Sequence, residues 1–315
     1  MTETVLSPVT QSSPAKLVDS IPTKEIIKLY KEEFAVDVSN YFDGKERIDI
    51  YECLSTGYKF YYPFSLAGNA QFYEELQNQH KKLGLSYYRE WGYDHEFAFH
   101  KVDNGDFVLD IGCGSGIFLE RIKAKTSSVF GLEFNEMAIR SCEKKGISVK
   151  KEFIQEHAKK NREVYDVVCA FQVLEHVYDI KSFIESALLT LKKGGKFIIG
   201  VPNNQPFFQR FNKYEPLNLP PHHMGLWNKN TFINLQNHFP VQFLDAAYER
   251  PGKLYIDAYF QAKYFFNIKS RIHKHSLAEK IEMVLASPIT LLISSARYIF
   301  QGIPGGFIVV SFEKK

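Results

Sequence analysis

The sequence predicts an α/β fold of the Rossmann-like type, with a doubly wound, mostly parallel sheet of seven strands whose last strand is antiparallel. Short apolar runs alternate with segments of helical periodicity from Phe107 to Val201. A glycine-rich turn follows the first run, and residues suited to ligand contact follow the later ones. Since the carboxyl ends of parallel strands share one edge of a sheet, these residues are expected on one rim. A lid of helices and a hairpin precedes this core, and a helical insertion lies near the C-terminus.

Length and composition bound the class of protein. The 315 residues are 45% hydrophobic, which indicates a globular chain with one elaborated domain or two small ones. The net charge of +3 is small and scattered, so no nucleic-acid partner is expected. The four cysteines form no C-x-x-C pair, and no signal peptide is recognisable, so a cytoplasmic location is expected. The predicted parts are a disordered segment 1–20, an aromatic lid and hairpin 21–104, a core 105–249 with 303–315, and a helical insertion 250–302.

The N-terminal part is predicted from apolar spacing and turn residues. A Ser-Thr-Gly turn divides an alternating stretch, which indicates a hairpin over Ile48–Phe64. Helical spacing predicts helices over Pro22–Phe34, Asn69–His80 and Ser86–Val102.

The stretch FVLDIGCGSGIFLERI, from Phe107 to Ile122, is the strongest local signal. Val108, Leu109 and Ile111 form an apolar run typical of a strand covered on both faces. The following G-x-G-x-G turn differs from the G-x-G-x-x-G dinucleotide fingerprint. Glycines permit positive φ and close approach of a ligand, and the helix after the turn is expected to offer free N–H groups. A tight turn without a ligand is the alternative.

The rest of the core is expected to continue the alternation. Asp179 is a predicted helix cap, and glycines at 146 and 194–195 are predicted helix ends. The predicted strands are Ser128–Glu133, Ile147–Phe153, Tyr165–Phe171, Lys196–Val201, Val241–Tyr248 and Phe307–Phe312, and the predicted helices are Asn135–Lys144, Ile180–Leu191 and Asn228–Asn237.

Glu133 ends the second strand, 17 positions after Gly116. An acid at this distance in a Rossmann-like unit meets ribose hydroxyls, and a carboxylate can accept hydrogen bonds from both of them. The sequence therefore predicts a ribose contact at Glu133. A solvated strand end is the alternative.

Three motifs of this chain together resemble those of the class I S-adenosylmethionine-dependent methyltransferases. They are D-I-G-C-G-S-G, Y-D-V-V-C-A-F followed by Q-V-L-E-H, and K-K-G-G before the strand that ends in P-N. The resemblance covers about Phe107–Tyr248 and the last strand, and is strongest to the small-molecule and glycan O-methyltransferases. It implies S-adenosyl-L-methionine as the cofactor. The implied cofactor contacts are Asp110, Gly112, Cys113, Gly114, Gly116, Glu133, Phe134, Gln155, Phe171 and Gln172. After the third strand, Gln155 and Glu156 are alternatives for the adenine contact.

In similar methyltransferases the helices before the first strand cover cofactor and substrate. This implies Tyr87, Tyr88 and Trp91 as substrate contacts, with core packing as the alternative. The hairpin resembles an extension found in methyltransferases of polysaccharide gene sets, where it often carries a C-x-x-C-G knuckle. Here only Cys53 remains and Thr56 takes the second position, so a packing role is expected.

Two adjacent histidines, His222 and His223, lie in a proline-rich loop, and His176 follows the fourth core strand. An imidazole with a pKa near ~6.5 suits removal of a proton from an alcohol. The three histidines are therefore candidate bases. Substrate binding, metal binding and a structural role stay open for the pair, but two neighbouring histidines rarely make a metal site, so no metal is predicted.

The expected reaction is methyl transfer to a small molecule, most plausibly to a hydroxyl of a sugar or glycan. The alternatives are N- or C-methylation of a nucleotide-sugar or secondary metabolite, a catalytically silent partner subunit, and an NAD(P) dehydrogenase, which the glycine spacing disfavours. The uncharged segment Met283–Ala296 has 14 residues, too few for a span of ~20. Packing of 277–300 against the core or a second copy, or contact with a membrane surface, is expected instead.

Overall fold

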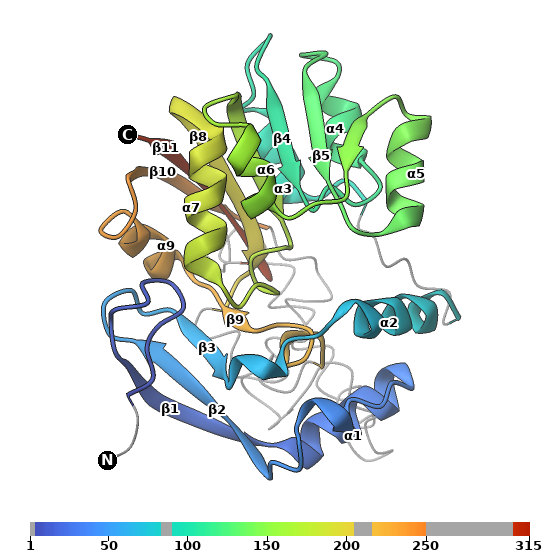
Figure 1. The fold of residues 1–315 in the computed structure, drawn as a ribbon, viewed down its shortest axis with the longest axis vertical. Helices are drawn as coiled ribbons and strands as arrows, with labels where there is room; N and C mark the ends of the chain where they lie inside the picture. The colour runs from blue at the N-terminus through green and yellow to red at the C-terminus, as the bar shows by residue number, and fades with distance from the viewer. Residues whose placement is uncertain (1–3, 83–89, 205–215, 250–304) are drawn as a thin grey trace, which may run out of the picture.

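A computed structural model describes residues 4–82, 90–204, 216–249 and 305–315. Two sheets organise these residues, one of seven strands and one of four. Figure 1 shows the larger sheet with its helices above a smaller N-terminal unit. Tyr87, Tyr88 and the predicted insertion 250–302 lie outside the described residues.

The seven-stranded sheet confirms the predicted fold class. Its order is β10-β11-β8-β7-β4-β5-β6, and β11 is antiparallel to both of its neighbours. The order reverses between β4 and β7, the switch point at which ligands of such sheets bind. The strands are β4 (Val108–Ile111), β5 (Val129–Leu132), β6 (Ser148–Lys150), β7 (Tyr165–Phe171), β8 (Leu191–Pro202), β10 (Val241–Tyr248) and β11 (Phe307–Lys314).

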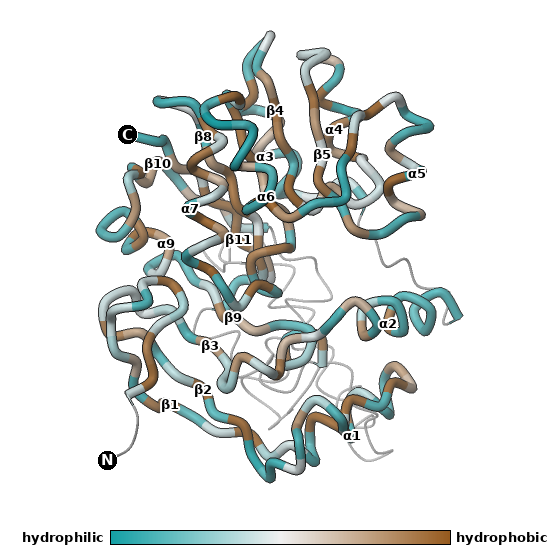
Figure 2. The backbone as a smooth tube through the Cα atoms, in the orientation of Figure 1, coloured by the Kyte–Doolittle hydropathy of each residue, from teal (hydrophilic) through white to brown (hydrophobic). Residues whose placement is uncertain are grey.

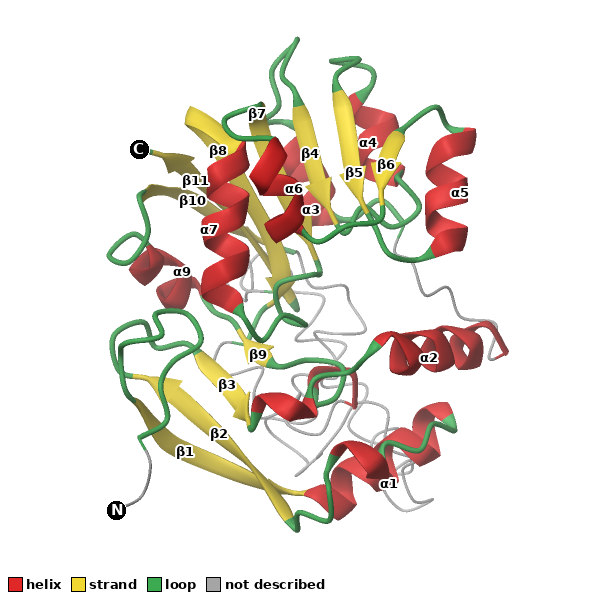
Figure 3. Ribbon diagram, in the orientation of Figure 1, coloured by secondary structure: helices red, strands yellow, loops and turns green. Residues whose placement is uncertain are grey.

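Helices cover both faces of this sheet (Figure 3). Alternate residues of β7 enter two different apolar clusters, as the two faces of a strand require. One cluster joins the sheet to α6 (Ile154–Lys160), α7 (Ile180–Thr190) and α9 (Lys229–Leu235). The other joins it to α3 (Tyr93–Phe99), α4 (Ile117–Ile122) and α5 (Glu136–Lys144). Figure 2 shows the matching pattern, with apolar strands inside and hydrophilic turns outside.

The N-terminal unit is a four-stranded antiparallel sheet in the order β1-β2-β3-β9. The predicted hairpin is confirmed as β2 (Arg47–Cys53) and β3 (Lys59–Tyr62). Strand β9 (Gly225–Leu226) comes from the segment after β8, so residues from the core half of the sequence complete this sheet. Two helices, α1 (Thr23–Phe34) and α2 (Ala70–Lys82), confirm the predicted helices 22–34 and 69–80.

The predicted disorder of residues 1–20 is wrong from residue 4 onward. Strand β1 (Ala15–Pro22) pairs along the whole of β2. Val9 and Ile21 are fully buried, so this segment gains apolar contacts as well as backbone hydrogen bonds. These contacts offset the entropy cost that its Ser-, Thr- and Pro-rich composition suggested it could not meet.

Three predicted elements differ most from the structure. Of the helix expected over Ser86–Val102, residues 86–89 lie outside the described residues, and the described part is helical over α3, which begins after the extended Gly92. Strand β6 is shorter than Ile147–Phe153, and β8 begins five residues before Lys196. The Lys-Lys-Gly-Gly segment therefore lies within β8, where Gly194 has a φ of 75°. No helix among the described ranges is long and apolar enough to cross a membrane.

Candidate active site

The turn between β4 and α4 requires glycine at both ends. Gly112 and Gly116 have φ values of 74° and 78°, a region that favours glycine. A Cβ on Gly116 would lie 2.7 Å from Cys142 Sγ, and one on Gly112 would lie 2.5 Å from Val173 Cγ2. The turn is therefore packed closely against α5 and against the segment that follows β7.

Backbone hydrogen bonds tie this turn to the end of β5. The amides of Gly112 and Cys113 donate to Leu132 O at 2.8 and 3.0 Å. The Gly114 amide donates to Glu133 Oε2 at 2.9 Å. These three N–H groups are engaged within the protein, and the hydrogen bonds fix the turn beside Glu133. The free N–H groups expected at the start of α4 stay a prediction.

The Glu133 carboxylate lies at the centre of this corner. Its Oε1 accepts from the amides of Phe134 and Asn135 at 2.6 and 2.8 Å, in addition to the bond from Gly114 at Oε2. A carboxylate offers about four lone-pair positions, so roughly one stays open for a ribose hydroxyl in this arrangement. The side chain is only partly buried, so a ligand can reach it.

Asp110 lies beneath the turn, on β4. Its carboxyl is 2% exposed, and Oδ1 has no hydrogen-bond partner among the described residues. Burial, followed by the nearby Cys142, Glu133 and Asp94, raises the pKa of this carboxyl well above its ordinary range. A buried acceptor without a donor is costly, so Asp110 suits a cationic ligand group at this position.

Two exposed aromatic rings follow β5 and β6. Phe134 is 44% exposed and Phe153 is 64% exposed, and their ring centroids lie 4.4 Å apart. Exposed neighbouring rings can stack on a planar base. Sequence analysis missed Phe153, which ended a predicted strand and had the pattern of a core residue.

The structure separates the two candidates for the adenine contact. Glu156 is exposed, and its two carboxylate oxygens bond Lys159 Nζ at 2.7 and 2.9 Å. Gln155 is partly buried in the first turn of α6, beside Phe153. The adenine contact of Gln155 stays a prediction.

At the switch point, Phe171 ends β7 and Gln172 follows it in the left-handed region, with φ of 56°. The Gln172 amide donates to Gly200 O at 2.7 Å, and its side-chain Nε2 donates to Asp94 Oδ2 at 3.3 Å. Asp94, on α3, is buried and was not singled out by sequence analysis. Its close approach to β8 depends on Gly200, where a Cβ would lie 2.9 Å from Asp94 Cβ.

Of the predicted lid over the cofactor, the structure describes helix α2 and Trp91. From α2, Gln77 Oε1 accepts from Asn135 Nδ2 at 2.7 Å, so this helix reaches the residue two positions after Glu133. Trp91 donates to Glu96 Oε2 at 2.7 Å, and its ring stacks on Phe118 of α4. These contacts give Trp91 a packing role, and substrate contact stays a prediction.

The three candidate bases come together although 46 positions separate His176 from His222. Their ring centroids lie 4.6 to 4.7 Å apart, and one ring nitrogen of each lies within 4.8 Å of the others. His222 and His223 are buried, and His176 keeps 22% side-chain exposure. Burial lowers the pKa of His176 to about 4, against the opposing effect of the nearby carbonyls of His222 and Gln172. Burial likewise holds the pKa of His222 and His223 well below the ordinary range.

Tyrosines of the N-terminal unit hold the histidine loop. Tyr30 and Tyr61 donate from their hydroxyls to the carbonyls of Leu219 and Asn218, at 2.9 and 3.1 Å. Tyr73 on α2 donates to His222 O at 3.2 Å, and its hydroxyl lies 3.3 Å from His176 Nδ1. The N-terminal unit therefore positions the histidines, and the proline-rich loop is part of its packing.

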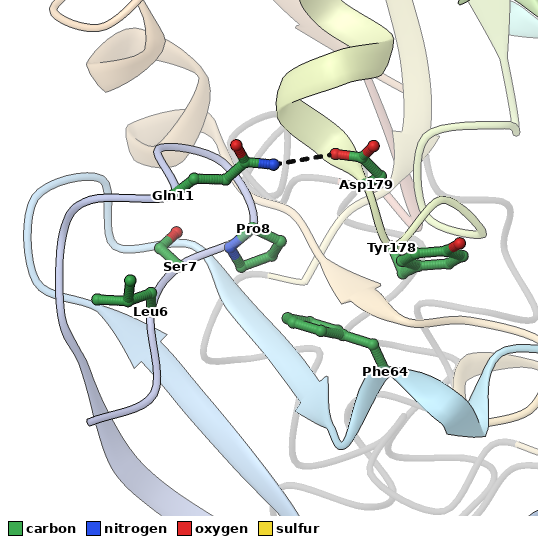
Figure 4. A pocket seen from close by; sticks show the side chains of 7 residues that line it. All are labelled: Leu6, Ser7, Pro8, Gln11, Phe64, Tyr178 and Asp179. Carbon is green, nitrogen blue, oxygen red and sulfur yellow. Dashed lines mark hydrogen bonds between the residues drawn. The ribbon is translucent and has the colours of Figure 1, made fainter. Parts of the chain in front are cut away.

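A surface pocket of about 290 Å³ lies where the N-terminal segment meets the turn after β7 (Figure 4). Tyr178 and Phe64 stack in it with centroids 6.4 Å apart, and Gln11 donates to Asp179 Oδ1 at 3.2 Å. The pocket begins two residues after His176, and its lining residues are Leu6, Ser7, Pro8, Gln11, Phe64, Tyr178 and Asp179.

Comparison with known proteins identifies the core. Residues 85–252 match the sequence model of a methyltransferase domain family, which is more than half of the chain. The chain belongs to this methyltransferase family. It is an S-adenosylmethionine-dependent methyltransferase, as the resemblance of its motifs implied.

Curated relatives match a shorter stretch of this methyltransferase. The ubiquinone biosynthesis O-methyltransferase of Salmonella arizonae is 34% identical over 105 residues, which is 31% of this chain and 43% of the relative. The match thus spans less than half of the relative's length. Among solved structures, a SAM-dependent methyltransferase from Archaeoglobus fulgidus aligns with a TM-score of 0.46 and 19% identity, over 78% of this chain and all of that one. A putative one from Listeria monocytogenes aligns with a TM-score of 0.45 and 16% identity, over 70% and 97% of the two chains.

The residues on the rim fit S-adenosylmethionine. Glu133 has an acceptor position for a ribose hydroxyl, and the Phe134–Phe153 pair offers an apolar surface for the adenine. The buried Asp110 oxygen that lacks a donor suits the ammonium of the methionine half. When bound, the cofactor supplies a methyl group on a positively charged sulfur, and the protein supplies binding and alignment.

Proposed function

We propose that this methyltransferase transfers its methyl group to a hydroxyl of a small-molecule acceptor, with sugar and glycan hydroxyls as the first acceptor class. The observation that carries the proposal is the position of the histidine cluster. His176 lies five residues after the end of β7, on the strand edge that also bears Glu133, and the rings of His222 and His223 contact it. A hydroxyl must lose its proton as the new C–O bond forms, and imidazole nitrogens on this rim can accept it.

The protein's contribution is mainly alignment and exclusion of water. The hydrogen bonds between the glycine turn and Glu133 hold the donor half, and the tyrosine bonds to residues 218–222 hold the acceptor half. Holding two reactants in line supplies a large part of the rate gain in such transfers. Burial lowers the pKa of His222 and His223, so their rings are neutral and have a nitrogen that can accept a proton, although they are weaker bases than free imidazole.

The relative from Salmonella arizonae supports oxygen as the acceptor atom, because its name is that of an O-methyltransferase. The same name favours a second candidate acceptor, an intermediate of ubiquinone biosynthesis. Catalysis of N- or C-methylation, and a silent methyltransferase-like subunit, are the other outcomes that a product screen distinguishes.

The test is incubation with S-adenosylmethionine and panels of sugars, nucleotide-sugars, phenols and amines, followed by mass spectrometry for added methyl groups. O-methylated products are expected, and turnover should fall in a His222→Ala/His223→Ala variant while S-adenosylhomocysteine affinity stays close to wild type. Methylation on nitrogen or carbon alone would refute the acceptor assignment. A folded protein that binds cofactor but methylates nothing in these panels would favour the silent subunit.

A further inference from the structure

The histidine cluster has the ligand arrangement of a metal site. Sequence analysis had only two adjacent histidines, which rarely bind a metal by themselves, and the fold adds His176 as a third. One ring nitrogen from each of His176, His222 and His223 lies within 4.8 Å of the other two. Three converging imidazoles from two separate segments match the ligand count of catalytic three-histidine zinc sites.

Hydrogen bonds at the other ring nitrogen set the tautomers of two of these rings. His176 Nδ1 lies 2.7 Å from His222 O, and His222 Nδ1 lies 2.8 Å from Leu217 O. A backbone carbonyl only accepts, so each Nδ1 carries the hydrogen and donates it. In a neutral ring this leaves the lone pair on Nε2, which is the nitrogen that can bind a metal.

A chain of amides sets the third ring in the same way. Asn204 Nδ2 donates to Pro202 O, a carbonyl that only accepts, so Asn204 Oδ1 faces Asn218. Asn218 Nδ2 donates to Asn204 Oδ1 at 3.0 Å, and Asn218 Oδ1 therefore faces His223. His223 Nδ1 donates to it at 3.2 Å, which again leaves Nε2 with the lone pair. Anchoring of the second ring nitrogen by a carbonyl is the usual support for metal-binding histidines.

We propose that His176, His222 and His223 bind a divalent transition-metal ion of the Zn²⁺ type through their Nε2 atoms. Nitrogens around a tetrahedral zinc lie about 3.3 Å apart, and one nitrogen of each ring, Nδ1 or Nε2, already lies within 4.8 Å of the others, so small ring movements of about 1.5 Å would suit that set of nitrogens. The carboxylate of the buried Glu175 lies 4.0 Å from His176 Nε2 and provides negative charge beside the dication. Three protein ligands leave a fourth position for an oxygen.

The open position suggests how the site would take part in catalysis. A hydroxyl oxygen bound to Zn²⁺ would have a lower pKa than a free one and would release its proton to water, so with the ion bound the three rings would hold the ion and would not take the proton themselves. This use of the ion rests on the proposed hydroxyl acceptor, whereas the binding of the ion does not.

The test measures metal binding directly, without methyl transfer. Tag-free protein is stripped with a chelator, dialysed against ZnCl₂ and analysed for bound zinc, and a parallel sample is titrated with Co²⁺. The wild type is expected to hold one Zn²⁺ per chain and to give the visible absorption of tetrahedral Co²⁺. A His222→Ala/His223→Ala variant should lose at least about 100-fold in affinity, as loss of two ligands implies. His100→Ala is the matched control, because His100 is exposed on the surface and outside the cluster.

Folded wild type that binds neither ion, or a double variant that binds zinc as tightly as wild type, would overturn the proposal. If the double variant does not fold, the Co²⁺ spectrum of the wild type decides, since its presence supports the site and its absence refutes it. Binding of S-adenosylhomocysteine, measured on the same samples, tests the cofactor half separately. Zinc binding without O-methylated products would leave the metal site standing and refute only the hydroxyl acceptor.

Discussion

Replacing Glu133 by alanine tests the cofactor site most directly. The carboxylate accepts three backbone hydrogen bonds, from Gly114, Phe134 and Asn135. Because these occupy three of about four lone-pair positions, roughly one ribose hydroxyl can bond to Glu133 without rearrangement. A hydrogen bond to a charged group contributes about 1.5–3 kcal/mol.

The expected loss of affinity follows from that accounting. Loss of one charge-assisted hydrogen bond corresponds to a roughly 10- to 150-fold larger dissociation constant in Glu133→Ala. If both ribose hydroxyls bonded to the carboxylate, as the sequence suggested, the loss would be about the square of this factor. The size of the change therefore shows whether the backbone bonds persist when the cofactor is bound.

Isothermal titration calorimetry with S-adenosylhomocysteine measures the change. Glu136→Ala is the matched control, because it removes a carboxylate three positions away that is 61% exposed and pairs with Lys151 on the surface. Its affinity should match wild type. Unchanged binding in Glu133→Ala, or an equal loss in the control, would refute the assignment of Glu133 to the ribose.

Three further predictions concern stability. Because the pKa of Asp110 is raised, its stabilising contribution is full below the unfolded pKa and is lost as pH rises through the folded pKa. Denaturant titrations of cofactor-free protein should therefore show Asp110→Asn gaining stability relative to wild type as pH rises from about 4 to 8. A difference that does not depend on pH would contradict this. Gly116→Ala should lower the free energy of unfolding, measured in urea, by about 1–3 kcal/mol, because the new Cβ would meet Cys142 and the residue has a positive φ. An unchanged urea midpoint would show that the turn relaxes to accept the methyl group. Deleting residues 1–22 removes β1 and the buried Val9 and Ile21, so the free energy of unfolding should fall by about 3 kcal/mol or more, and the melting temperature should fall with it. Deletion of a disordered segment would leave the melting temperature unchanged.

Most of the core strands could be predicted because they are local apolar runs between turn residues, although β6 is the short and mostly polar Ser-Val-Lys. It could not find β1 or β9, whose strand character comes from pairing with distant residues. Strand β9 has two residues and pairs with β3, more than 160 positions earlier in the chain. No local pattern marks so short a strand, and a Ser- and Pro-rich segment such as 4–14 has the composition of a disordered one.

The same distinction separates the predicted from the missed parts of the site. Asp110, Gly116 and Glu133 belong to local motifs, and the parallel sheet places them on one edge. Phe153 was missed because an aromatic residue at a strand end has the same pattern whether it is buried or exposed. The meeting of His176 with His222 depends on the fold of the segment after β8, which no periodicity predicts.

The two halves of the site therefore differ in how the protein builds them. The donor half is contained in β4, β5 and the turn between them, held by hydrogen bonds between residues 112–114 and 132–133. The acceptor half depends on Tyr30, Tyr61 and Tyr73, which bond to a loop that begins more than 140 positions later. Substitutions in the N-terminal unit can thus shift the histidines while leaving the glycine turn in place. If the proposed histidine site receives the acceptor, the choice of acceptor depends on this unit and on residues 216–226, and not on the glycine motif that identifies the methyl donor.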